Sequence, residues 1–587
     1  MVMKAFKKCN LRLFKRQASR FLTLILIVVV SIGFMSGIGE INLKIDIAIN
    51  DYYVDQNVAD LYVKSSKMTG FSASDVAWVE DKFGVENVKK GFSYEYEEDD
   101  GVVRVYNTDY TKAVNTLELI DGRLPKTADE IMVERETTTI KSYSIGDTVT
   151  IMQKQYTVCG IVANPLIVNN ADEPSFINSD LSLNKVFYLN TSVPITNDLY
   201  VTISDRTLFD GFSEEYEREI DELKALVESS ISDATVLSLY QNLGLYVLSE
   251  YANKVGTISI IFVVFFLLIT LLVVYSTMTR LYDEERSQMA CMKTLGYSNF
   301  SIIFRYVAFV FTASLIGGII ALFVGNALTS VVYSAFNLQY RMPEYPLVSD
   351  HLFYIASSLV ILLSVTLLTL FSGLNISRTK PSTFLLPKMQ KAGKKVLIER
   401  TFIWKKLSFR YKSTMRNVFL FKGRFFMTVI SVTGSTVLVF AGLGLLNCAS
   451  KIDGGSTLIS ISMALLIFSA VLCGLVVYNL TNINVGERKR EIATLMVLGY
   501  NDSEVSGYIF REIYIMGAIG ALLGLVGGYF FIDFVFSLID FGTLSDISWW
   551  SYLLTPVVTI VFCFIATILL RGKITKTDMN ASLKSIE

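Results

Sequence analysis

The sequence predicts a polytopic α-helical membrane protein with eight transmembrane helices, arranged as two four-helix repeats, and an α+β extracytoplasmic domain between helices 1 and 2. Three observations predict this fold class. The 587-residue chain is 52% hydrophobic, with a mean hydropathy of +0.46. Eight long stretches contain no Asp, Glu, Lys or Arg, and the two halves of the chain repeat the same motifs. A soluble protein of this length would instead divide into domains with polar surfaces.

The transmembrane helices follow from the uncharged stretches, because a helix needs about 20 mostly apolar residues to cross a bilayer. Residues 21–39 form the first predicted span. The second to fourth spans lie within residues 255–377. Residues 425–450 form the fifth span, and the last three lie within residues 456–571.

The distribution of charge predicts the orientation. Residues 40–254 contain 37 acidic and 18 basic side chains, whereas the rest of the chain contains 17 acidic and 35 basic ones. Basic residues concentrate in the N-terminal segment 1–20 and in the linker 378–424, and they continue into the tail 572–587. Because Lys and Arg are retained on the cytoplasmic side, we expect both termini and the linker in the cytoplasm.

The acidic segment 40–254 is predicted to be an α+β domain outside the cytoplasm. Short β-rich runs are separated by turn signals, and two stretches have helical spacing. The acidic surface either binds a cationic peptide or only keeps the domain soluble. We expect strands at residues 60–64, 102–106, 130–134, 148–152, 156–162, 186–189 and 199–203, and helices at 74–83 and 213–227.

Two short segments, residues 283–297 and 486–500, carry the clearest internal repeat. Each begins with charged residues, continues as an amphipathic helix and stops at a Leu-Gly-Tyr sequence, where glycine is the expected helix terminator. They either bind a cytoplasmic protein or lie along the lipid surface. The candidate contact residues are Glu284, Glu285, Arg286, Met292, Leu295 and Gly296 in the first segment, and Glu487, Arg488, Leu495, Leu498 and Gly499 in the second.

A second repeat is a series of small residues at every fourth position in the third and seventh spans. Both series begin 21 residues after the glycine of the Leu-Gly-Tyr stop. Small residues at this spacing let two membrane helices approach closely. The predicted packing residues are Gly317, Ala321 and Gly325 in the first half, and Gly520, Gly524 and Gly528 in the second.

Several kinds of chemistry have no sequence support. The chain has no G-x-x-x-x-G-K-[S/T] loop for nucleotide phosphates and no HExxH or paired-Cys metal motif. Its one histidine, His351, has no cluster of partners. No predicted span has a charged residue in its interior, which argues against an ion-coupled transporter. We therefore expect no enzyme, no cofactor within this chain and no nucleic-acid partner.

Together these motifs resemble the FtsX-like permease family of ABC transporters, which includes the MacB and LolC/LolE types. The resemblance lies in the two segments with the Leu-Gly stop and in residues 119–125 and 156–162 of the exterior domain. It implies that segments 283–297 and 486–500 are coupling helices. It also implies that each half binds one cytoplasmic ATPase subunit, which holds ATP and Mg. The protein would lie in a bacterial cell membrane, and ATP-driven motion would reach its exterior domain.

The chain departs from the simplest family members in two ways: both halves lie in one chain, and only the first half has an exterior domain. The resemblance implies an ABC transporter permease that extrudes a peptide, lipid or antimicrobial compound. A second hypothesis is a non-transporting regulator of an extracellular partner such as a cell-wall hydrolase, and a third is an antimicrobial-peptide sensing complex. In each case residues 40–254 would bind the extracellular protein, peptide or lipid.

Overall fold

The structure is a computed structural model. It describes residues 12–98, 101–110, 112–170, 175, 181–191, 195–203, 213–343, 351–378, 399, 404, 408–420, 422–451, 456–539 and 542–575. The expectations for the N-terminal segment before residue 12, for most of the linker and for the tail after residue 575 lie outside these residues.

The chain divides into two compact units. The membrane unit comprises Met1–Glu40, Gly256–Ser330 and Asp350–Glu587, and the sheet unit comprises Ile41–Val255 and Val331–Ser349. The sheet unit thus includes a segment that the sequence assigned to the third span and to the loop after it. Backbone hydrogen bonds and an ion pair attach that segment to the sheet domain, as described below.

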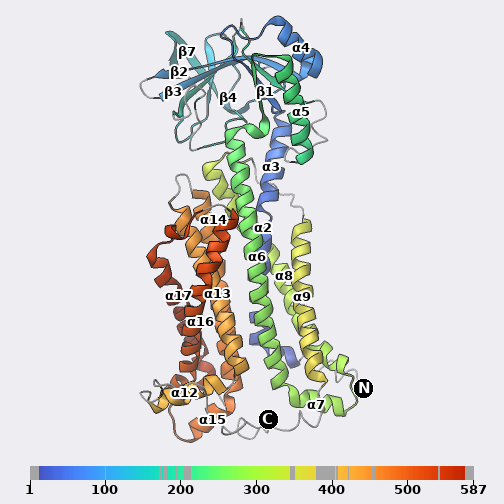
Figure 1. The fold of residues 1–587 in the computed structure, drawn as a ribbon, viewed down its shortest axis with the longest axis vertical. Coiled ribbons are helices and arrows are strands. Elements are labelled where there is room, and N and C mark those ends of the chain that lie inside the picture. Colours follow the sequence, from blue (N-terminus) through green and yellow to red (C-terminus); the bar gives the residue numbers. More distant parts are fainter. Residues whose placement is uncertain are drawn as a thin grey trace. The chain divides into compact units, whose positions relative to one another are not determined.

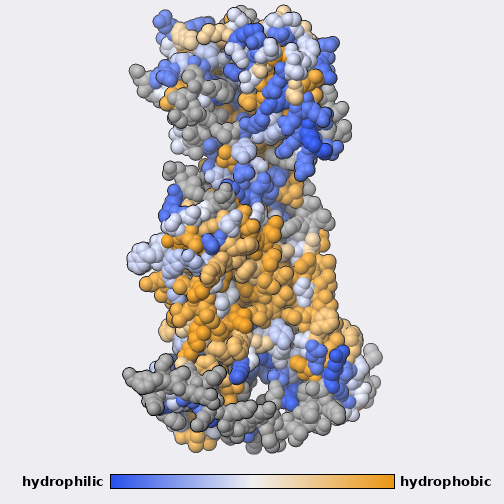
Figure 2. Space-filling model, viewed as in Figure 1, coloured by the Kyte–Doolittle hydropathy of each residue, from blue (hydrophilic) through white to orange (hydrophobic). Residues whose placement is uncertain are grey.

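Eight helices within the described residues are long and apolar enough to cross a membrane, which confirms the predicted number. Hydrophobic side chains gather over these helices in Figure 2. In the first half they are α2 (Ala18–Gly39), α6 (Leu243–Glu284), α8 (Asn299–Gln339) and α9 (His351–Ser377). In the second half they are α13 (Lys422–Ala449), α14 (Ser456–Glu487), α16 (Asp502–Ile539) and α17 (Trp549–Thr575) (Figure 1).

Within the described residues, three short α-helices accompany the spans. Helix α7 (Arg286–Thr294) connects α6 to α8, and α15 (Lys489–Val497) connects α14 to α16. Helix α12 (Phe409–Leu420) precedes α13. The predicted amphipathic segments therefore contain helices, shorter at both ends than the repeat in the sequence suggested.

The sheet domain contains a ten-stranded sheet in the order β10-β1-β9-β2-β3-β8-β5-β7-β4, with β6 paired to β7. Most pairs are antiparallel, but β3 with β8 and β5 with β7 are parallel. The strands are β1 (Leu61–Ser65), β2 (Val88–Glu98), β3 (Gly101–Thr108), β4 (Glu118–Gly122), β5 (Glu130–Glu134), β6 (Thr148–Ile151), β7 (Lys154–Ala163), β8 (Leu183–Leu189), β9 (Asp198–Val201) and β10 (Ala234–Ser238).

Helices α4 (Ala73–Phe83) and α5 (Glu214–Ser230) complete the predicted α+β domain, and a third helix, α3 (Ile41–Asp55), was not expected. One core joins side chains of α4 and α5 to strands β1 and β9, among them Val79, Ile220 and Leu199. Strands β2, β4 and β10 also escaped prediction. Strand β2 was not predicted because a charged residue such as Glu95 argues against a buried strand. In the structure Glu95 is buried against Arg104 of β3 in an ion pair of 2.5 Å.

Candidate functional site

Helix α7 ends in a backbone arrangement that its Leu-Gly-Tyr sequence predicts. Gly296 has a φ of 88°, a left-handed conformation that glycine adopts without strain. Its N–H donates to the carbonyl of Lys293 (3.1 Å), and the N–H of Tyr297 donates to that of Met292 (3.1 Å). These two bonds form a Schellman motif, which satisfies the last carbonyls of the helix.

Helix α15 ends in the same way. Gly499 has a φ of 89°. Its N–H donates to Met496 O (3.0 Å), and the N–H of Tyr500 donates to Leu495 O (3.1 Å). Both halves of the repeat therefore use glycine to turn the chain from a short helix into the following membrane helix.

Each short helix buries one face and exposes its last leucine. Met289 and Ala290 of α7 are buried, whereas Leu295, at its end, is 77% exposed. In α15 the corresponding exposed residue is Leu498, at 69%. The predicted contact residues Met292 and Leu495 are only partly buried. An exposed leucine at a matching place in both halves is available to another molecule.

The charged residues before α7 bind within the membrane unit instead. Glu284 accepts two hydrogen bonds from Arg20, at 2.8 and 2.5 Å. Glu285, whose side chain is 2% exposed, forms an ion pair with Arg16. Arg286 is half-buried. The two glutamates therefore fix the start of α7 to α2 and to the segment that leads into it, which the sequence alone did not indicate.

The charged residues before α15 are also internal. Arg488 is buried and forms an ion pair with the buried Glu512 of α16, and it lies 3.8 Å from Glu491. Glu487 lies 3.7 Å from Arg280, at the end of α6 in the other half.

Arg280 connects the two halves, and sequence reasoning missed it. Its guanidinium is 6% exposed and donates to Asn484 Oδ1 (3.1 Å) and to Thr428 Oγ1 (3.4 Å). A second hydrogen bond joins the two halves close to Arg280 in the sequence: Asn479 of α14 donates to Thr277 of α6 (2.8 Å). The signal was present, since Arg280 follows directly on the uncharged stretch 255–279.

Comparison with known families decides the assignment of these halves. The sequence model described as FtsX-like permease C-terminal matches residues 260–381 and 463–579, which contain α7 and α15 with their flanking spans. The chain carries two FtsX-like permease domains. Its two domains of this kind lie in one polypeptide, and an ABC-type permease subunit is the corresponding class of protein.

Other comparisons add less. No curated protein matches the permease. The periplasmic region of MacB from Actinobacillus actinomycetemcomitans is a similar solved structure, at 15% identity and a TM-score of 0.20, with coverage of 30% of this chain and 88% of that one. The assignment depends on the two membrane segments and not on this likeness.

The small residues of the permease lie against the first span of their own half. A Cβ at Gly317 would lie 2.9 Å from Val28 Cγ1 of α2. A Cβ at Gly524 would lie 2.5 Å from Thr436 Cβ of α13. The remaining predicted packing residues are placed alike: Gly325 faces Ser36, Gly520 faces Val432, Gly528 faces Phe440, and Ala321 is fully buried.

The sheet unit of the permease has a buried carboxyl group with a raised pKa, Glu134 at the end of β5. It is fully buried, and this burial raises its pKa from 4.5 to about 7. Its carboxylate accepts the hydroxyl of Tyr188 (2.5 Å) and the backbone N–H of Asn164 (3.2 Å). Among the described residues no group of His, Cys, Asp and Glu is arranged to hold a metal ion.

Proposed function

We propose that this FtsX-like permease is the membrane subunit of an ABC transporter that works by mechanotransmission. A separate cytoplasmic ATPase would bind at α7 and α15, with one subunit at each helix. ATP hydrolysis there would drive a movement of the sheet domain, which would lie on the outer side of the cell membrane. Both chain termini would be cytoplasmic. The permease itself supplies no catalytic group and holds no cofactor in this proposal.

The matching exposed leucines carry the proposal. Leu295 and Leu498 occupy the same place at the ends of two matching helices, and both are more than two-thirds exposed. Contiguous exposed apolar residues mark interaction sites, and Leu498 has the exposed Val497 and Tyr500 beside it in the chain. Two matching surfaces in one chain fit a partner that binds as two copies.

The connections within the chain support transmission. Helix α7 joins α6 to α8 directly, and both of those helices contribute residues to the sheet unit. A force applied to α7 would therefore act on two helices that enter the sheet unit. The ion pair of Glu285 with Arg16 at its start fixes α7 within the membrane unit as well.

Replacement of both leucines tests the proposal. We expect Leu295→Asp with Leu498→Asp to reduce co-purification of an ABC ATPase from native membranes at least tenfold, because a charge on each contact surface opposes its burial. The thermal stability of the permease should hardly change, since both side chains are exposed. Met68→Asp is the matched control, because Met68 is a fully exposed residue of the sheet domain.

Equal recovery of the ATPase with the unaltered permease, the double variant and the control would contradict the proposal. Recovery of no ATPase with the unaltered permease would also contradict it.

Cargo export by the sheet domain is one form of the proposal, with a peptide, lipid or antimicrobial compound as cargo. Regulation of an extracellular protein is the other. Crosslinking from Met68 and neighbouring exposed positions distinguishes them, because a stable protein adduct favours regulation and a bound lipid or peptide favours export.

A further inference from the structure

The end of helix α8 belongs to the sheet unit. Residues Val331–Ser349 form part of that unit, although α8 begins at Asn299 in the membrane unit. Helices α3 and α6 reach the sheet domain through the continuous chain, because the domain lies between them in the sequence. The chain after α8 instead leads on to α9. Its attachment to the sheet domain therefore depends on non-covalent contacts.

Backbone hydrogen bonds form the first part of this attachment. The N–H of Asn170 donates to the carbonyl of Gln339 (2.8 Å), and the N–H of Arg341 donates to that of Val168 (2.7 Å). Between them, Asn169 and Tyr340 form an isolated β-bridge. The last residue of α8 and the two residues that follow it are thus paired with the loop that follows β7.

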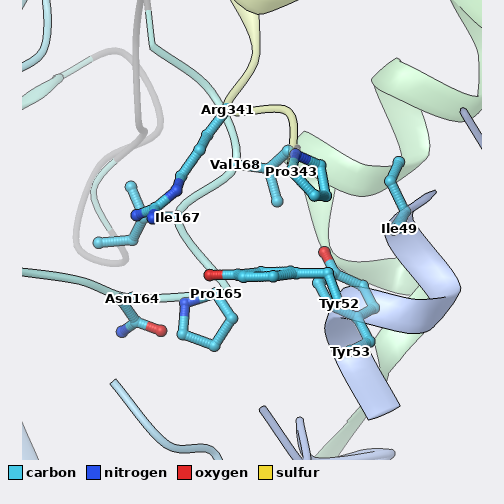
Figure 3. Close-up of a pocket in the computed structure, with 9 residues that line it drawn as sticks. All are labelled: Ile49, Tyr52, Tyr53, Asn164, Pro165, Ile167, Val168, Arg341 and Pro343. Atoms are coloured by element: carbon cyan, nitrogen blue, oxygen red, sulfur yellow. The ribbon is translucent and has the colours of Figure 1, made fainter. Parts of the chain in front are cut away.

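The side chain of Arg341 forms the second part. Its guanidinium makes an ion pair with Glu118 of β4 and lies 5.9 Å from the centre of the Tyr52 ring of α3. The hydroxyl of Tyr52 donates to the same glutamate (3.2 Å). Figure 3 shows Arg341 and Tyr52 reaching toward the same space from two different segments. One arginine therefore joins the end of α8 to a helix and to an edge strand.

The pocket beside these groups is too small for a substrate. It is lined by Tyr52, Tyr53, Pro165, Arg341 and other residues, and its cavity volume is about 10 Å³ (Figure 3). A single water molecule needs about that much room. The surroundings of Arg341 are those of a packed joint, in which an arginine is only 17% exposed.

We propose that the pair of Arg341 and Glu118, which we call the α8 clamp, is the element that makes the third span a route of transmission to the sheet domain. This inference rests on the proposed function and deepens it. Helix α7 lies between α6 and α8, so it acts on both. The route through α6 is covalent, whereas the route through α8 depends on non-covalent contacts. The clamp is the charged part of these contacts and holds the backbone pairing beside it together.

The clamp is tested first in the isolated full-length permease by hydrogen–deuterium exchange. We expect Arg341→Gln to accelerate exchange of the amides of Asn170 and Arg341 at least tenfold, because it removes the charge that holds the paired segments together. Arg123→Gln is the matched control. Arg123 directly follows β4, and its guanidinium pairs with Glu130 of β5 at 2.5 Å. Unchanged exchange in Arg341→Gln would overturn the clamp.

The second test uses the permease with its ATPase bound. ATP should alter exchange in the sheet domain, and Arg341→Gln should reduce that change by at least half while ATP hydrolysis continues. If the ATP-induced change persists in full, the α8 route is wrong. If ATP has no effect on the unaltered complex, the proposed function fails, but the exchange test in the isolated permease still decides whether the clamp exists.

A charge exchange guards against a variant that simply misfolds. Glu118→Arg combined with Arg341→Glu restores the ion pair with its charges reversed. We expect this double variant to recover at least half of the protection that either single change loses. Loss of protection equal to the sum of the two single changes would show that the residues act independently and would overturn the clamp.

Discussion

Helices α7 and α15 end in the same backbone conformation, but charged residues of opposite sign anchor them. Both end in a Schellman motif with a glycine near φ 90° and both expose their last leucine. The buried residue at the start of α7 is an acid, Glu285, and it binds the segment before α2. At the matching position α15 has a base, Arg488, which binds Glu512 of α16.

This difference separates what the two halves share from what distinguishes them. The features offered to a partner are the same on both helices, as two copies of one ATPase would require. Each anchoring residue needs only a partner of opposite charge within the chain, so the sign of its charge can differ between the halves. Each half therefore holds its short helix on a different neighbour, the segment before α2 in one case and α16 in the other.

The anchor of α15 should be the more sensitive of the two. Both members of the pair Arg488 and Glu512 are 4% exposed. Arg488→Met leaves a buried carboxylate without its partner, which costs about 3–5 kcal/mol of the free energy of unfolding. In the first half Arg16 is 51% exposed and solvent weakens its pair with Glu285, so Arg16→Met should cost less. Thermal unfolding in detergent measures both.

Removal of both charges provides the control for that comparison. Arg488→Met with Glu512→Leu leaves no unpaired charge, so most of the lost stability should return. Equal losses for Arg488→Met and Arg16→Met would refute the idea that the two anchors differ in strength. A double variant as unstable as the single one would point to packing, not charge, as the source of the loss.

The two halves also differ because only the first carries the sheet domain, and its buried Glu134 predicts a dependence on pH. The folded-state pKa of about 7 is above the ordinary value of 4.5, so folding favours the protonated form. This contribution to stability is complete below pH 4.5 and disappears as the pH rises through 7. The loss is about 3 kcal/mol. The charged neighbours Arg135 and Arg341 favour the ionised form and limit the loss.

Thermal unfolding of the full chain between pH 4.5 and 8 checks this dependence. Glu134→Gln keeps the size of the side chain but cannot ionise, so the slope of stability against pH should flatten. Tyr188→Phe removes one hydrogen bond to the carboxylate and should make the slope steeper, because that bond favours the ionised form. A slope that Glu134→Gln leaves unchanged would assign the pH dependence to another group.

The small-residue stripes are a feature that both halves share, so they should respond alike. A Cβ at Gly524 would lie 3.0 Å from the carbonyl oxygen of Thr433, and one at Gly317 would lie 3.1 Å from that of Ile25. Since backbone cannot give way easily, alanine at either position should cost about 1–3 kcal/mol of stability.

Gly507 is the matched control for the stripes. It lies in α16, the same helix as Gly524, but no heavy atom would lie within 4 Å of a Cβ there. Gly507→Ala should therefore stabilise the helix by roughly 0.5–1 kcal/mol. A loss of stability for this variant as large as for Gly524→Ala would show that the effect belongs to the helix and not to the stripe.

The sequence was most informative where the cause lies within a short segment. Hydropathy located the eight spans, and the Leu-Gly-Tyr repeat located both short helices and their glycine stops. The α+β class of the exterior domain also followed from local patterns. Each of these depends on neighbouring residues, so one chain read in order was sufficient.

Structure was needed where the cause is a partner far away in the chain. Strand β2 was missed because the charge of Glu95 argues against a buried strand until Arg104 is placed beside it. Arg280 looked like the polar end of a span, although it binds Asn484 in the other half. The end of α8 looked like membrane helix, because nothing near residue 341 in the sequence indicates a pair with Glu118.

The smallest expected effect concerns the glycine stops and tests whether α7 and α15 are truly equivalent. At Gly296 and Gly499 a Cβ would meet nothing within 4 Å, so the only cost of alanine is the left-handed backbone. That cost is about 1 kcal/mol at each position. Gly572→Ala, which also meets nothing within 4 Å but has no positive φ, is the control and should cost nothing. Thermal unfolding should give equal losses for Gly296→Ala and Gly499→Ala. Unequal losses would mean that the two stops are held by different surroundings, and the equivalence of the two short helices would then be limited to their sequence.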